Sequence, residues 1–165
     1  RVEKARRAHA DLFISIHVNA HPRQATSGVE TYFLNLATNT EAMRVAAREN
    51  ATSSHNISDL QDILSDLMQN SKIHESSILA EYVHKRLSTG LGNRYATKDL
   101  GVKQAPFYVL IGAEMPAILA EISFISNKTE AERLRQDTYL GEVAGHIAAG
   151  VAGYAEHQAT AAARL

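Results

Sequence analysis

The sequence predicts an α/β fold: a mostly parallel sheet with helices on both faces, plus a helical insertion. Two observations predict it. Short apolar runs alternate along the chain with longer segments that carry apolar residues at helical spacing. The length of 165 residues, with 45% hydrophobic and 21% charged residues, suits one globular domain with a substantial core.

The first residues, up to about residue 9, are expected to be the end of a helix. Strands are expected where apolar and β-branched residues follow one another, over residues 12–18, 28–34, 107–111 and 117–122. Further helices are expected over residues 40–48, 58–69, 76–87 and 137–157, where apolar residues recur at helical spacing. The glycines in Thr89-Gly90-Leu91-Gly92 should end the third of these helices.

Composition excludes several classes of function. The 17 basic and 18 acidic residues give a formal net charge of −1, which argues against a nucleic-acid partner. The absence of cysteine excludes disulfides, thiolate metal ligands and a cysteine nucleophile. The chain has no run of the roughly 18 to 20 apolar residues that a membrane span needs, so none is expected.

Two polar residues stand out because they interrupt apolar strands. His17 ends the first strand, and open α/β sheets build their sites at the carboxyl ends of strands. It is either a structural histidine or a metal ligand or base. Glu121 lies in the apolar strand Ala117-Ile118-Leu119-Ala120-Glu121-Ile122, where burying an unpaired carboxylate is costly. The alternative is that Glu121 faces solvent on an edge strand.

The other histidines call for less explanation. His84 and four other histidines lie in polar or amphipathic segments, and they are expected to be surface residues. His146 is expected to be a partly exposed residue of the last helix.

Three segments together resemble a known family. Asp11-Leu12-Phe13-Ile14-Ser15-Ile16-His17-Val18-Asn19-Ala20 is similar to a motif of the zinc-dependent N-acetylmuramoyl-L-alanine amidases of the amidase-3 family. Gly28-Val29-Glu30-Thr31-Tyr32-Phe33 resembles the strand that follows it in that family. The segment from Met115 to Asn127 resembles a third block, and the three occur in the family's order.

The resemblance implies hydrolysis of the amide bond between N-acetylmuramic acid and L-alanine in peptidoglycan, with Zn²⁺ as cofactor. On this chain His17 matches one zinc ligand, and Glu121 matches the catalytic acid/base. Zinc activates a bound water, and a nearby carboxylate can move that water's proton to the leaving amine. The residues that bind the substrate are not predicted.

The resemblance is incomplete at the start of the chain. The family's first histidine ligand and its glutamate ligand have no counterpart here and would lie before Arg1. We therefore expect residues 1–165 to be the C-terminal part of an amidase catalytic domain, and this chain alone to lack two zinc ligands.

The segment from about residue 39 to 75 is longer than the family's core needs. It resembles the helical regulatory insertion of the division-associated Gram-negative amidases, which covers the active site until an activator protein displaces it. Glu49 is the residue expected to block the zinc, and an ordinary solvated glutamate at a helix end is its alternative. This resemblance implies a periplasmic, autoinhibited enzyme of cell division whose partners are peptidoglycan and an activator that binds the insertion.

Two other functions remain open. One is a non-catalytic peptidoglycan-binding or scaffold protein that retains the amidase fold. The other is a different zinc peptidase with the same geometry at its strand ends.

Overall fold

The structure is a computed structural model that describes residues 1–51 and 72–164. Its strands are β1 (Phe13–Asn19), β2 (Val29–Leu34), β3 (Asp99–Ala105) and β4 (Ala117–Phe124). Its helices are α1 (Val2–Arg7), α2 (Thr40–Glu49), α4 (Ile73–Tyr95), α5 (Lys128–Arg133) and α6 (Asp137–Ala162), with one 3₁₀ turn, η1 (Tyr108–Leu110). The helix expected over residues 58–69 lies outside the described residues.

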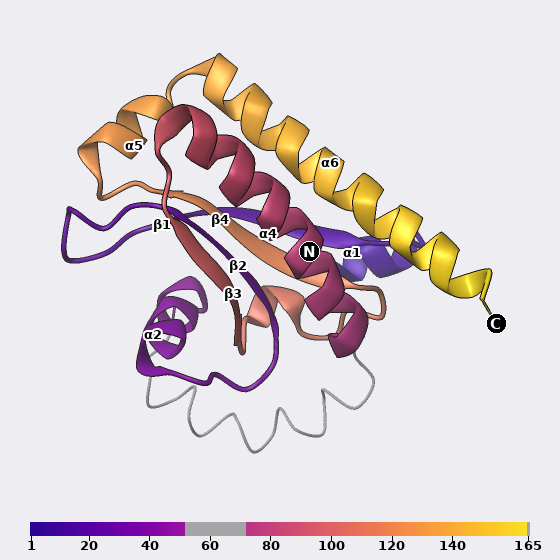
Figure 1. The fold of residues 1–165 in the computed structure, drawn as a ribbon. Coiled ribbons are helices and arrows are strands. Elements are labelled where there is room, and N and C mark those ends of the chain that lie inside the picture. Colours follow the sequence, from indigo (N-terminus) through magenta and orange to yellow (C-terminus); the bar gives the residue numbers. More distant parts are fainter. Residues whose placement is uncertain (52–71, 165) are drawn as a thin grey trace. The chain divides into compact units, whose positions relative to one another are not determined.

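The four strands form one sheet in the order β1-β4-β2-β3 (Figure 1). Backbone bonds join Phe13 to Pro116 at the start of β1 and Asn19 to Ile125 at its end, so β1 and β4 are parallel. The end of β2 and the start of β4 belong to the same compact unit, so the central pair runs antiparallel. The α/β class is thereby confirmed, with a mixed sheet.

The chain divides into two compact units, and each strand contributes residues to both. The first unit contains residues 1–15, 32–77 and 103–119. In its core the Tyr32 and Phe107 rings meet edge to face, with centroids 4.9 Å apart. Helix α2 begins where the Asn39 side chain accepts a hydrogen bond from the Ala42 amide at 2.8 Å.

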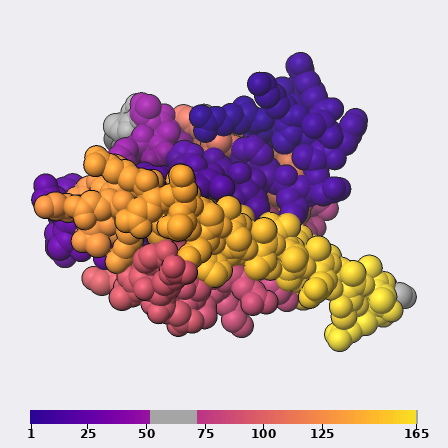
Figure 2. All heavy atoms as spheres, turned by 90° about the horizontal axis from the view of Figure 1, so that it is seen from above, coloured from indigo at the N-terminus to yellow at the C-terminus, as the bar shows by residue number. Residues whose placement is uncertain are grey.

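The second unit contains residues 16–31, 78–102 and 120–165. In it, most of α4 and all of α6 run side by side (Figure 1). Buried α6 residues recur about every four positions, at Tyr139, Val143, Ile147, Gly150 and Tyr154. The last turns of α6 carry mostly exposed residues, and Figure 2 shows this end of the helix projecting.

Two expected strands differ from the structure. Residues 107–111, expected to be a strand, contain the turn η1 instead, in which the Leu110 amide donates to the Phe107 carbonyl at 3.0 Å. Strand β3 was not expected. It lies at the sheet edge and is mostly half-buried, so its sequence lacks the apolar run of a central strand.

Two helices also differ from expectation. Helix α4 continues through Gly90 and Gly92 to Tyr95, because continuing the helix buries Leu91 completely. The helix ends where Ala96 adopts a positive φ of 51°. On α6, apolar Leu140 is 41% exposed, because the buried stripe of this helix passes through Tyr139 instead.

Candidate metal and catalytic site

His17 lies near the end of β1, in the second unit. The side chains of β1 alternate between two environments: Ser15 and Asn19 are buried, whereas Ile16 and Val18 are exposed. His17 shares the face of Ser15 and Asn19 and is half-buried. Although its sequence is mostly apolar, β1 is therefore not buried on both faces, because it is the edge strand of the described sheet.

Glu121 lies on β4, beside β1 in the sheet. All eight residues of β4 are buried, and Glu121 is 0% exposed. The solvent-facing alternative for Glu121 is therefore excluded. A carboxylate is kept in such surroundings only when a proton, a hydrogen bond or a cation compensates for the lost hydration.

The structure brings His17 and Glu121 together. Both lie in the C-terminal halves of parallel, neighbouring strands, and their ligand atoms are within 4.8 Å of each other. An imidazole nitrogen and a carboxylate oxygen are both donors that zinc accepts. The pair therefore suits a metal ligand with an acid/base beside it.

Glu49 is the last residue of α2, in the first unit. Its side chain is 19% exposed, and its carboxylate lies 3.8 Å from Arg48 Nε. The next residue, Asn50, fixes this end of α2: its side chain donates to the Pro106 carbonyl and accepts from the Tyr108 amide, both at 2.8 Å. Glu49 is thus held on an anchored helix end that is only partly solvated.

Two residues after His17, hydrogen bonds of Asn19 hold the end of β1 in place. Its carbonyl accepts from the Ile125 amide at 2.8 Å, and its side-chain oxygen accepts from the Ala20 amide at 2.7 Å. Its side-chain nitrogen donates to Glu30, a carboxylate that is only 2% exposed. Glu30 was not predicted as a site residue, although a glutamate between Val29 and Thr31 in an apolar strand gives the same sequence signal as Glu121.

A third buried carboxylate, that of Glu130, joins the ends of two strands. Glu130 accepts hydrogen bonds from the Gly28 amide at 2.9 Å and from the Phe124 amide at 2.6 Å. These bonds tie the end of β4 to the residue before β2. Burial raises the pKa of Glu130 above its ordinary value, while the two amide bonds oppose that shift.

His84 is a buried residue rather than the expected surface histidine. It is 5% exposed, with Nε2 2.8 Å from Asp99 Oδ1 and Nδ1 3.1 Å from Thr31 Oγ1. It joins α4 to β2 and β3. The hydrogen bond with His84 lowers the pKa of Asp99.

The comparison with known proteins decides the family. The family model described as N-acetylmuramoyl-L-alanine amidase matches residues 1–153. The chain belongs to the N-acetylmuramoyl-L-alanine amidase family. His17 and Glu121 both fall within the matched segment.

Individual relatives agree with this assignment. The chain is 34% identical to N-acetylmuramoyl-L-alanine amidase LytC of Bacillus subtilis over 154 residues, which cover 93% of this chain and 23% of LytC. It is 34% identical over 172 residues to amidase AmiC of Escherichia coli, covering 99% of this chain and 40% of AmiC. This amidase-family chain therefore spans less than half of either relative.

A solved structure matches the fold as well. Amidase AmiC2 of Nostoc punctiforme superposes with a TM-score of 0.62 at 26% identity, covering 94% of this chain and 63% of AmiC2. Among the described residues, no helix of this amidase-family chain is long and apolar enough to cross a membrane.

Proposed function

We propose that this chain carries part of the catalytic site of a zinc-dependent enzyme that hydrolyses the amide bond between N-acetylmuramic acid and L-alanine in peptidoglycan. The observation that carries the proposal is the pairing of half-buried His17 with fully buried Glu121 in a chain of this family. A scaffold protein that had lost catalysis would have no need of a buried carboxylate beside a histidine.

His17 would hold the zinc through its imidazole, with the ion supplying Lewis-acid activation of water and of the amide carbonyl. Glu121 would take a proton from water and deliver it to the departing amine of L-alanine. Its complete burial favours this role, because a carboxylate is kept out of water only where its charge is compensated, as it would be beside a bound metal ion. The network from Asn19 to Glu30 would keep the end of β1, and with it His17, in place.

Catalytic zinc sites ordinarily take three protein ligands. We propose that His17 is one of them, and that the two other catalytic ligands come from outside residues 1–165. Glu49 has the right chemistry to occupy the position that catalysis needs for water, which would make the resting enzyme autoinhibited. Its place on an anchored, partly buried helix end supports this role over that of a solvated glutamate.

The insertion at about residues 39–75 would then be the regulatory segment of the catalytic domain, and an activator protein that binds it would release Glu49. An enzyme with this substrate acts outside the cytoplasm. We place it in the periplasm, in peptidoglycan cleavage at cell division.

The test is hydrolysis of purified muropeptides by the full-length product of the gene that encodes this chain. Glu121→Ala should lower amide cleavage by about 100-fold or more while zinc content stays nearly intact, the scale expected for loss of a general base. His17→Ala should lower both. Glu132→Ala, which removes an exposed carboxylate on α5, is the matched control and should retain activity. Full activity in Glu121→Ala would overturn the proposal.

The regulatory proposal has a separate test. Glu49→Ala should raise basal activity without any partner protein, because it removes a contact of the resting state only. Glu41→Ala, at the other end of α2, is the control. Unchanged activity in a folded, zinc-loaded Glu49→Ala variant would leave Glu49 as an ordinary helix-end residue.

A further inference from the structure

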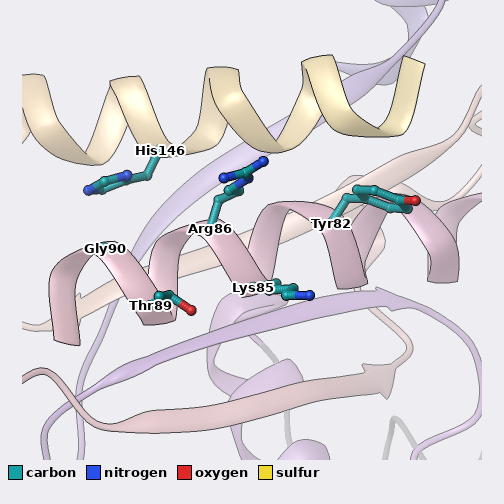
Figure 3. Close-up of a pocket in the computed structure, with 6 residues that line it drawn as sticks. All are labelled: Tyr82, Lys85, Arg86, Thr89, Gly90 and His146. Atoms are coloured by element: carbon teal, nitrogen blue, oxygen red, sulfur yellow. The ribbon is translucent and has the colours of Figure 1, made fainter. Parts of the chain in front are cut away.

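A hollow of about 370 Å³ lies between α4 and α6 in the second unit (Figure 3). Neither His17 nor Glu121 lines it. Its lining residues are Tyr82, Lys85, Arg86, Thr89, Gly90 and His146. In Figure 3 the side chains of Tyr82, Arg86 and His146 occupy the space between the two helices.

The hollow is positively charged, and no carboxylate lines it. Lys85 and Arg86 are both exposed, and neither forms an ion pair with another residue in the described part of the chain. The nearby Glu142 of α6 is already paired with Arg94. Two cations without counter-charges in a chain of net charge −1 create a local site for an anion.

Two glycines, one on each helix, give the hollow its shape because they have no side chain. A Cβ on Gly90 would come within 2.2 Å of His146 Cε1, so the imidazole lies directly on the backbone of α4. A Cβ on Gly153 would come within 3.0 Å of the Tyr82 ring, which also lies 5.6 Å from the His157 ring. The His146 and Tyr82 rings therefore lie in positions that are open only because the facing residue is glycine.

We propose that the α4–α6 hollow binds a phosphate group. The Arg86 guanidinium and the Lys85 ammonium supply charge-assisted donors, and the ring N–H of His146 adds a further donor. The proposal does not depend on amide hydrolysis, because the hollow shares no residue with the proposed catalytic pair.

Titration with inorganic phosphate at constant pH and ionic strength, followed through the His146 ring resonances by NMR, tests the site. We expect a saturable shift of His146 that sodium chloride does not produce. Arg86→Gln should weaken binding by about tenfold, the loss expected for one charge-assisted hydrogen bond. Arg135→Gln removes an exposed positive charge elsewhere in the unit and should leave the titration unchanged.

Gly90→Ala tests the shape of the hollow rather than its charge. The new methyl group would displace the His146 ring, the movable end of a side chain, so phosphate binding should fall while the protein stays folded. A linear, non-saturating response in the wild type would overturn the proposal. So would equal affinities in the wild type and Arg86→Gln.

Two probes separate the sources of the phosphate. Glycerol phosphate represents a soluble or polymer-borne group, and phosphatidylglycerol vesicles represent a lipid headgroup. Binding of glycerol phosphate that depends on Arg86, without vesicle association, assigns the hollow to a soluble or polymeric ligand. Vesicle association that depends on Arg86 assigns it to a membrane surface, and failure of both probes overturns the site.

Discussion

Gly150 of α6 lies against the backbone of Val83 in α4, and a Cβ on Gly150 would come within 2.5 Å of the Val83 Cα. The helices approach this closely because Gly150 has no side chain. The obstructing atoms are backbone, which cannot move aside as a flexible side chain does.

Gly150→Ala should therefore destabilise the protein by about 1 to 3 kcal/mol, the usual cost of overpacking. Gly145→Ala is the matched control, because a Cβ there meets nothing within 4 Å and alanine favours the helix. Urea unfolding of both variants provides the measurement. Equal stability of the two would show that the helices separate without cost.

The bond between His84 and Asp99 should make stability depend on pH. The bond lowers the pKa of Asp99 below its ordinary value of 3.8. The stabilisation is therefore fully present above that ordinary value and is lost as the pH falls through the lowered pKa of the folded state. Asp99 is 58% exposed, so solvent screening keeps the contribution below about 1 kcal/mol.

Asp99→Asn should accordingly reduce the free energy of unfolding at pH 6. It should have little effect at pH values below the lowered pKa of Asp99, where the carboxyl group is protonated in the folded protein as well. Asp11→Asn, at an exposed carboxylate before β1, should have no such pH-dependent effect. A constant difference between the wild type and Asp99→Asn at every pH would contradict the assigned cause.

Loss of Glu130 should be costly because two buried amides depend on it. Glu130→Ala leaves the Gly28 and Phe124 amides without their acceptor, and we expect a loss of about 2 to 4 kcal/mol in unfolding free energy. Glu130→Gln retains one acceptor oxygen and should lose less. The same loss in both variants would contradict this cause, because glutamine leaves no cavity and the cost would then arise from the lost negative charge.

Zinc should bind residues 1–165 weakly, with micromolar affinity at best, because two of the three ligands that we propose for the catalytic zinc come from outside these residues. Competition with a chromophoric chelator measures the affinity. His17→Ala should abolish it, and His74→Ala, at an exposed histidine, should not. One zinc per chain retained through dialysis would show that these residues already form a complete site.

His17 and Glu121 could be predicted from the sequence because each is a polar residue in an apolar strand. Burial makes such a residue costly, so the pattern marks it as a candidate for either a structural or a functional role. Strand β3 could not be predicted in this way, since an edge strand with mixed polarity gives no apolar pattern.

His84 shows a second limit of prediction. Its partners, Thr31 and Asp99, lie on two strands, and nothing near His84 in the chain indicates them. The continuation of α4 through Gly90 likewise depends on a contact with a residue that is distant in the sequence. The His146 ring of a distant helix fills the space that glycine leaves, so packing between helices outweighs the local preference to end the helix.

The pairing of β1 with β4 also sets the order of events during synthesis. The ribosome releases β1 early and β4 only after β2, α2, α4 and β3 have followed. The His17 imidazole therefore emerges well before the Glu121 carboxylate, and the pair can form only when β4 has followed. A nascent chain that stops before β4 therefore holds no assembled His17–Glu121 pair.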